Sequence, residues 1–342
     1  MERLTIADNR QQSAKTMQND IFVSVKNLSR DYGPLRAVNN VSFEVKRGEV
    51  LGFLGPNGAG KSTTMQMLTG NLAPTEGEIL INGIDMLDHP KRAKANIGFL
   101  PEQPPLYKEL TVDEYLSFCA RLNRVSKGNL KEALQAAKQR CGLHEVGRRL
   151  IGNLSKGFQQ RVGIAQAIIH TPAIVILDEP TVGLDPIQIR EIRALIRELR
   201  NAHSVILSTH ILPEVQATCD RVQIINKGEI VLNDSVQALQ RHMQISSTIV
   251  AFRKALQSHE LSDLPNIESV ERLDDNSFRI HYNPQSNPAD GIVKRAVEKD
   301  WGLLELTPEK RSLEEIFVDI TTSEMHTVEG TSEATAKEEQ AA

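Results

Sequence analysis

The sequence has few cysteines and no long apolar segment. Cys119, Cys141 and Cys219 are too few and too widely spaced for a disulfide framework or a zinc site. No stretch approaches the roughly 18 consecutive apolar residues that a membrane-spanning helix needs. The longest apolar runs, such as residues 173–177, have the length of a strand. We therefore expect a protein of a reducing compartment that does not itself cross a membrane.

The chain also lacks an excess of positive charge. Its 40 Lys and Arg residues face 44 Asp and Glu residues, and the net charge of −4 argues against nucleic acid as a partner. No internal repeat is visible, which excludes a chain with two copies of one domain. The length of 342 residues fits one large α/β domain with an appendage.

Strand-like and helix-like segments alternate over residues 20–232, which predicts one α/β domain. Its predicted strands are residues 21–25, 41–45, 50–54, 79–81, 97–100, 173–177 and 205–208. Its predicted helices begin near Lys61 and cover residues 189–200, with a helical insert at about residues 103–165. Two short apolar runs, residues 222–225 and 229–232, predict a closing hairpin.

The sequence changes character after residue 232, which predicts a small α+β domain over residues 233–321. Its predicted strands are residues 247–253, 277–282 and 302–307, and its predicted helices are residues 289–299 and 312–319. The last segment, residues 322–342, is acidic and poor in apolar residues, so we expect it to be disordered. Residues 1–19 are polar and lack the apolar core of a secretory signal, which predicts a disordered leader.

A glycine-rich string, G-P-N-G-A-G-K-S-T, follows the predicted strand at residues 50–54 and opens a helix. Its glycines let the backbone curl, so that successive N–H groups point at phosphate oxygens near the positive end of the helix. A chance glycine loop is the alternative, but strand, loop and helix follow in the required order. The candidate triphosphate-binding residues are Gly55, Pro56, Asn57, Gly58, Ala59, Gly60, Lys61, Ser62 and Thr63.

Within this loop, Lys61 is expected to neutralise the β- and γ-phosphates and the hydroxyl of Ser62 to bind Mg²⁺. Asp178 and Glu179 follow the apolar run at residues 173–177, at the edge of a parallel sheet where nucleotides bind. Asp178 is the second expected magnesium ligand. Glu179 is the expected general base for the attacking water. An acidic helix cap would explain either carboxylate singly.

A second string, L-S-K-G-F-Q-Q-R-V, occupies residues 154–162. Ser155 can cap a helix there and Gly157 permits close approach, which makes an anion site suited to a γ-phosphate. The string resembles the signature motif of ABC ATPases, whose commonest form is L-S-G-G-Q. The resemblance covers about residues 21–232. It implies an α/β, P-loop NTPase fold of the ABC ATPase type with a helical signature subdomain, followed by the small C-terminal α+β domain.

The resemblance implies further site residues. Tyr32 stands where the family stacks an aromatic ring on adenine, although a core tyrosine is the alternative. Asp185, in T-V-G-L-D, stands in the D-loop, and His210, in S-T-H, matches the switch histidine that contacts the γ-phosphate. Lys61, Glu179 and His210 are thus the catalytic candidates. In the family, the glycine loop and the signature complete a site across two subunits, which implies a dimer, expected to be a homodimer, around two Mg-ATP.

Two departures from the family pattern bear on function. Glu102 stands where the family usually has a glutamine, and Gln103 follows it. A carboxylate there can ligate a metal but repels phosphate, and we hypothesise that Glu102 does the work of the glutamine. Lys156 and Phe158 replace the usual glycine and glutamine of the signature. Together with residues 302–317, these features resemble ATPases of the ABC-2 exporter class, of the drug-resistance and gliding-motility types.

The function that this resemblance implies is an ATP-hydrolysing subunit that energises a separate, membrane-spanning ABC-2-type permease, with export as the expected direction. ATP binding would close the dimer and hydrolysis would reopen it. The expected location is cytoplasmic and peripheral, on the inner face of the cell membrane through the permease. Two alternatives stay open: an ABC ATPase that acts on ribosomes or DNA, and a metabolite kinase with the same phosphate loop.

Overall fold

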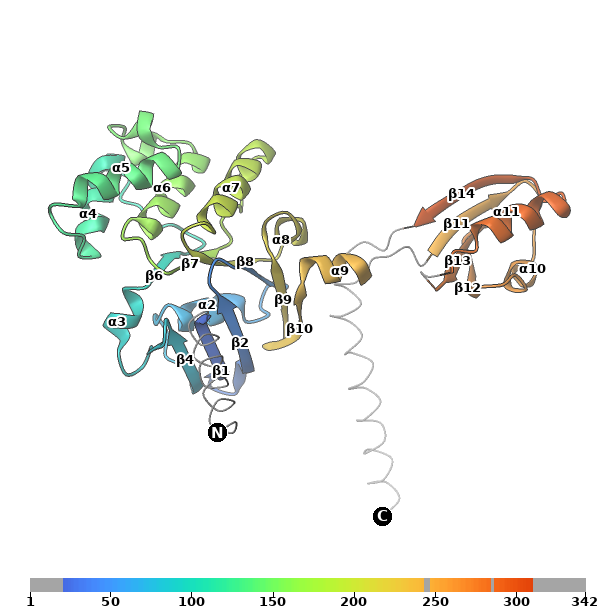
Figure 1. The fold of residues 1–342 in the computed structure, drawn as a ribbon, viewed down its shortest axis with the longest axis horizontal. Helices are drawn as coiled ribbons and strands as arrows, with labels where there is room; N and C mark the ends of the chain where they lie inside the picture. Colours follow the sequence, from blue (N-terminus) through green and yellow to red (C-terminus); the bar gives the residue numbers. More distant parts are fainter. Residues whose placement is uncertain (1–20, 243–246, 284–285, 310–342) are drawn as a thin grey trace, which may run out of the picture. The chain divides into compact units, whose positions relative to one another are not determined.

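The computed structural model describes residues 21–242, 247–283 and 286–309 (Figure 1). The chain divides into two compact units, residues 1–236 and 237–342. This division lies just beyond residue 232, because residues 233–235 still pair within β10 (Glu229–Ser235) against β9 (Arg221–Asn226). The expected leader at residues 1–19, the expected helix at residues 312–319 and the expected tail at residues 322–342 lie outside the described residues.

A six-stranded sheet forms the centre of the first unit, with the strand order β10-β9-β3-β8-β7-β6. All neighbours in it are parallel except β10 and β9. The remaining strands are β3 (Val50–Leu54), β6 (Ile97–Leu100), β7 (Ile174–Asp178) and β8 (Ser204–Thr209). β3, β7 and β8 are buried at every residue, as expected for apolar runs inside a parallel sheet. Their carboxyl ends therefore meet at one edge.

A second, antiparallel sheet has the strand order β2-β1-β4-β5. Its strands are β1 (Ile21–Tyr32), β2 (Leu35–Lys46), β4 (Glu76–Ile81) and β5 (Ile84–Asp85). β1 and β2 are longer than predicted, because bulges interrupt the alternation that marks a strand in the sequence. Asn27 and Asn40 take left-handed backbone angles of φ 50° and 51°, and the Asn27 amide donates to Asn40 Oδ1 at 2.7 Å.

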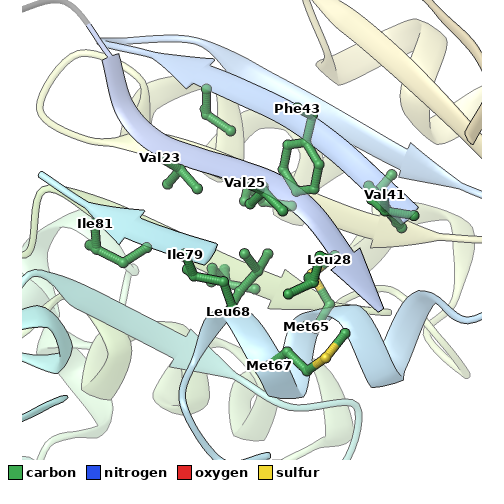
Figure 2. Close-up of a cluster of buried hydrophobic side chains, with 14 of the residues drawn as sticks. Val23, Val25, Leu28, Val41, Phe43, Met65, Met67, Leu68, Ile79 and Ile81 are labelled. Atoms are coloured by element: carbon green, nitrogen blue, oxygen red, sulfur yellow. The ribbon is translucent and has the colours of Figure 1, made fainter. Parts of the chain in front are cut away.

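An apolar core joins the antiparallel sheet to helix α2 (Lys61–Leu68) and to β3. Met65, Met67 and Leu68 of α2 lie against side chains of β1 and β4 such as Val25 and Ile79 (Figure 2). Each fully buried side chain of this size contributes about 1.5–3 kcal/mol. The packing fixes the start of α2 at the edge of the central sheet.

The other helices of the first unit follow or interrupt the strands. They are α3 (Pro90–Lys94), α4 (Val112–Leu122), α5 (Leu130–Arg140), α6 (Lys156–Ile168), α7 (Pro186–Leu199) and α8 (Leu212–Thr218), with 3₁₀ turns at His144–Val146 and Ile151–Asn153. Helix α9 (Val236–His242) begins at the last residue of this unit and continues into the second. Figure 1 shows α4, α5 and α6 grouped apart from β1, β2 and β4. A capping box of Thr111 and Glu114 begins α4. None of the described helices has both the length and the apolarity that crossing a membrane requires.

The second unit has the element order βαββαβ. Its elements are β11 (Ser247–Phe252), α10 (Ser258–Ser262), β12 (Ile267–Arg272), β13 (Ser277–Tyr282), α11 (Ala289–Glu298) and β14 (Leu303–Glu309). The antiparallel strand order β12-β13-β11-β14 is the ferredoxin-like arrangement. Phe252, Phe278, Ile292 and Trp301 belong to its apolar core. The sequence analysis did not predict β12.

Candidate active site

The glycine loop connects β3 to α2 and leaves the start of the helix open to an anion. Gly60 has φ 106°, and a Cβ there would lie 2.6 Å from the carbonyl oxygen of Ala37. At Gly55 a Cβ would overlap the carbonyl oxygen of Ile225. No side-chain hydrogen bond caps α2, so its first N–H groups can receive a phosphate.

Lys61 lies inside this loop and is only 6% exposed. Its Nζ donates to the carbonyl oxygens of Gly55 at 2.8 Å and Pro56 at 3.2 Å, and lies 3.7 Å from Glu179 Oε1. Burial lowers the pKa of Lys61, whereas nearby carboxylates, Glu179 foremost, oppose this shift. The ammonium is therefore held at the point where a phosphate would approach.

Glu179 follows β7 and is held on both carboxylate oxygens. Oε1 lies 2.9 Å from His210 Nδ1, and Oε2 accepts from the hydroxyl of Thr209 at 3.3 Å. The backbone of Glu179 has φ 48°, a left-handed conformation that is strained for a glutamate and that clusters at functional sites. Its N–H donates to the carbonyl oxygen of Ser208 at 2.8 Å. These contacts hold the carboxylate of Glu179 in one orientation, as a general base requires.

Asp178 has the features of a cation ligand. It is buried, and its Oδ1 has no hydrogen-bond partner among the described residues. Burial raises the pKa of Asp178, and the hydroxyls of Ser208 and Ser62 oppose this shift. No group of three or more His, Cys, Asp and Glu in the described part of the chain could hold a metal ion. One carboxylate and one hydroxyl instead match the few protein ligands that Mg²⁺ takes beside phosphates, so these residues fit that ion.

A cavity of about 360 Å³ opens beside the glycine loop, within the range of small-molecule sites. Its lining residues are Ala37, Asn57, Gly58, Gly60, Lys61, Ser62, Thr63, Glu102, Glu179, Val182 and His210. The structure thus brings together predicted residues from the glycine loop and from the segments after β6, β7 and β8. Ala37 and Val182 were not predicted from the sequence.

Tyr32, Gly55, Pro56 and Ala59 are predicted nucleotide-binding residues that do not line this cavity. Tyr32 ends β1 and is 44% exposed, which rules out the alternative of a core tyrosine. The guanidinium of Arg30 lies 5.0 Å from the centre of its ring, a cation–π contact. Ala59 is buried, and its N–H donates to the carbonyl oxygen of Pro56 at 3.2 Å.

The predicted signature and D-loop residues also lie outside the cavity lining, at the starts of α6 and α7. The hydroxyl of Ser155 accepts from the N–H of Phe158 and caps α6. Asp185 accepts from two N–H groups, including that of Gln188 at 2.9 Å, and caps α7. A Cβ on Gly157 would lie 2.7 Å from Cδ of Gln188, so the two helix starts pack together.

Two further contacts join the signature to the D-loop and to helix α7 within this chain. Lys156 Nζ lies so close to Gly183 that a Cβ on that glycine would overlap it. Arg161 Nη2 lies 2.6 Å from Glu191 Oε2, which ties α6 to α7. The two segments are therefore one packed surface.

Comparisons with known proteins identify the family. A match to the ABC transporter family covers residues 38–182. The ABC transporter ATP-binding protein YxlF of Bacillus subtilis (strain 168), itself uncharacterised, is 34% identical over 299 residues, which is 87% of this chain and 99% of the relative. The bacitracin transport ATP-binding protein BcrA of Bacillus licheniformis is 33% identical over 316 residues, 87% of this chain and 97% of that protein. The chain belongs to the ATP-binding proteins of ABC transporters.

Solved structures agree for the ABC ATPase unit. The structure of an ATP-binding subunit of an ABC transporter is 32% identical, with a TM-score of 0.59, over 65% of this chain and 92% of that one. A dimeric ATP-binding cassette bound to ADP and Pi, in a post-hydrolysis state, is 27% identical with a TM-score of 0.57, over 63% of this chain and 98% of that one. The predicted fold class is confirmed, and the protein is an ATP-binding and ATP-hydrolysing subunit.

The ABC ATPase site contains contacts that the sequence analysis missed. Thr209 holds Glu179, and Thr181 donates to the buried carboxylate of Glu214. The strings S-T-H and T-V-G-L-D contain both threonines, so attention to the neighbours of His210 and Asp185 could have found them. Glu214 gave no signal, because its helix is too short to show a helical period.

Proposed function

We propose that Glu179 is the general base of ATP hydrolysis and that the cavity beside the glycine loop binds the triphosphate. An incoming γ-phosphate draws Lys61 and His210 toward its oxygens, and Tyr32 stacks on the adenine. Glu179 then takes a proton from the water whose oxygen attacks the γ-phosphorus, while the bond to the bridging oxygen of ADP breaks. The contacts of both Glu179 oxygens support this role.

We assign Ser62 and Asp178 to Mg²⁺, because the exposed hydroxyl of Ser62 lies beside the buried carboxylate of Asp178, one oxygen of which has no partner among the described residues. When bound, this ion supplies positive charge against the charge that develops on the phosphate oxygens. Glu102 lines the same cavity, whereas Gln103 does not, which supports Glu102 as the residue that acts for the family's glutamine.

The proposed working unit is a homodimer with two shared sites. The observation that carries it is the separation within one chain: Lys61 and Glu179 line the cavity, whereas Ser155, Gly157 and Asp185 lie together outside it. A second copy would bring its Ser155 and Gly157 to the γ-phosphate. Because that phosphate bridges both copies, ATP binding favours the closed pair and hydrolysis the open one.

The proposed partner is a membrane-spanning permease of the ABC-2 exporter class, which places this subunit at the cytoplasmic face of the cell membrane. An apolar patch near Glu102 supports a docking site there. Tyr107 and Phe118 are exposed and their ring centres lie 5.7 Å apart. The hydroxyl of Tyr115, in the same helix as Phe118, donates to the carbonyl oxygen of Pro105 at 3.1 Å and ties the patch to the loop after Glu102.

The names of the relatives suggest a first cargo to test. BcrA is named for bacitracin transport, and a protein of Streptococcus pyogenes, 34% identical over 234 residues, is named for lantibiotic transport. We propose peptide antibiotics as the exported class. Cells that express the subunit with its permease should tolerate such peptides better than cells with the Lys61→Ala variant, and equal tolerance would exclude the tested peptides.

A pull-down of the Glu179→Gln variant tests the function as a whole. Tagged protein is purified with ATP from solubilised membranes, and Lys61→Ala serves as the control with weakened binding of the triphosphate. The expected result is one co-purified polytopic membrane protein and an ATP-dependent dimer by size-exclusion chromatography. Ribosomal proteins in place of the membrane protein would contradict the transport function and support the ribosomal alternative.

A further inference from the structure

Glu214 is a buried carboxylate that the proposed chemistry does not use. It is 1% exposed and lies in α8, four residues after His210. Thr181 donates its hydroxyl to Glu214 Oε1, and Arg193 Nη2 lies 3.9 Å from the same oxygen. Burying a carboxylate costs several kcal/mol unless its partners offset the lost hydration. The guanidinium is distant, so the offset comes mainly from two hydroxyl groups, those of Thr181 and Thr209, and the second of these also contacts Glu179.

The hydroxyl of Thr209 connects Glu214 to Glu179. Thr209 Oγ1 lies 3.3 Å from Glu179 Oε2 and 3.3 Å from Glu214 Oε2, and it accepts the N–H of Ile211 at 3.1 Å. A hydroxyl has one proton, so Thr209 can donate to only one of the two carboxylates at a time. The hydrogen bonding of Glu214 therefore decides what Thr209 offers to Glu179.

Thr209 is also the contact of Glu179 that ATP leaves in place. The two groups near Glu179 Oε1, Lys61 and His210, are those that a γ-phosphate attracts. Among the described residues, Thr209 supplies the contact on Oε2, on the side away from those two groups. Once the phosphate has engaged Lys61 and His210, the direction of the base depends on Thr209 and on whatever orders Thr209.

We propose that Glu214 is a positioning residue for ATP hydrolysis, which aims the carboxylate of Glu179 through the shared hydroxyl of Thr209. Through Thr181, the same carboxylate anchors the segment that leads into the D-loop at Asp185. The assignment rests on the proposed role of Glu179 as the base. In this proposal α8 helps to position the base, because α8 carries Glu214. Thr209, through which Glu214 acts, is the last residue of β8.

Other groups around Glu214 fit this role. Burial raises the pKa of Glu214, whereas the hydroxyl of Thr181 and the guanidinium of Arg193 oppose the shift, and the charge of Glu179 adds to it. Burial raises the pKa of the thiol of Cys219, the residue that follows α8, and the charges of Asp220 and Glu214 add to this rise. A carboxyl group that gains a proton here can donate to Thr209 and turn the threonine hydroxyl toward Glu179.

The test compares steady-state ATP hydrolysis by the full-length chain with Glu214→Gln, Glu214→Ala and Thr209→Val. Because it removes only orientation, Glu214→Ala should lower kcat by about 10- to 100-fold with KM for ATP within about threefold. Glu214→Gln should restore kcat to within about fivefold, since its amide can still accept from Thr181 and donate to Thr209. Nucleotide affinity and melting temperature show whether each variant is folded.

A double-mutant cycle separates positioning from general destabilisation. Thr209→Val should lower kcat as Glu214→Ala does, and the double variant should lose about as much as either single one, because both act through the same hydroxyl. Glu49→Gln is the matched control: Glu49 is largely buried, pairs with Arg221 at 2.6 Å and lies outside the cavity lining. It should leave kcat unchanged.

Several results would overturn the proposal. These are unchanged kcat in a folded Glu214→Ala or Thr209→Val, a loss in Glu214→Gln as large as in Glu214→Ala, or multiplicative losses in the double variant. The proposed role of Glu179 fails separately: full turnover by Glu179→Gln would remove the base itself. An inactive Glu179→Gln beside a fully active Glu214→Ala would overturn the positioning role alone.

Discussion

The interior of the first unit holds charged side chains, whereas the described interior of the second unit holds none. Lys61, Glu179 and Glu214 are each at most 7% exposed in the first unit. In the second unit the buried core is apolar, and Arg279 pairs with Glu309 at 2.7 Å on a partly exposed strand face. Because buried charge is costly, the first unit gives up stability to keep reactive groups in place, while the second unit's contacts serve its own folding.

The largest expected effect is the loss of the buried base. Glu179→Gln should lower the rate of phosphate release by about 10²- to 10⁴-fold, the usual contribution of general base catalysis. It should keep ATP affinity, because Lys61 and the glycine loop are intact. Undiminished hydrolysis would contradict the contrast between the two units, because the buried carboxylate of Glu179 would then have no part in the reaction. The control is Glu198→Gln, an exposed carboxylate of α7 that should have no effect.

The apolar core of the second unit gives the next largest effect, and in stability rather than activity. Phe252 packs against Trp301 with ring centres 5.6 Å apart, and Phe252→Ala should destabilise this unit by about 3–5 kcal/mol. Urea unfolding followed by the fluorescence of Trp301, the chain's one tryptophan, reports this unit directly. If the affinity for ATP falls as the second unit unfolds, the contacts of that unit serve more than its own folding, and the contrast between the two units is wrong.

Lys61→Ala should weaken ATP binding by about 10- to 100-fold, since a charge-assisted hydrogen bond contributes about 1.5–3 kcal/mol. Titration with a fluorescent nucleotide measures the change. Lys131→Ala removes an exposed lysine of α5 and should bind nucleotide normally. Normal affinity for ATP in Lys61→Ala would mean that Lys61 and the glycine loop do not bind the phosphates.

The smallest effect belongs to the surface ion pairs of the second unit. Arg279→Ala should cost about 1 kcal/mol or less, because partly exposed pairs contribute little. Arg279 lowers the pKa of Glu309, so the contribution of the pair is present above the ordinary glutamate pKa and is lost as pH falls through the lowered one. Urea midpoints of variant and wild type should differ at neutral pH and converge in acid. A difference between the two urea midpoints that widens in acid would contradict this role of the ion pair.

Sequence reasoning succeeded where structure is local. The strands Val50–Leu54 and Ser277–Tyr282 were predicted to the residue, and α2 begins at Lys61, near which its start was predicted. The spacing of apolar residues and the chemistry of a loop act within a few positions, so the sequence alone shows them. It failed for β12, Ile267–Arg272, whose partly buried residues, Ile267 and Val270, are three apart. This edge strand owes its place to β13, and the sequence pattern cannot show that pairing.

The same limit divides the candidate site. The residues within motifs, such as Lys61 and Asp178, could be predicted because each motif states its own chemistry. The bridge from Glu179 through Thr209 to Glu214 could not, since it exists only when the ends of β7 and β8 and the helix α8 meet. The motifs therefore identify the reactive residue, Glu179, but not the residues that hold it in place, Thr209 and Glu214.

The contact between Lys156 and Gly183 has a consequence for how such subunits change over evolution and in the laboratory. Gly183 tolerates its left-handed turn, φ 71°, beneath a long cationic side chain from another motif. Residues 156 and 183 should therefore vary together among homologues. A chimera with the commoner glycine at position 156 would also expose the turn at Gly183. The signature and the D-loop are therefore best exchanged together.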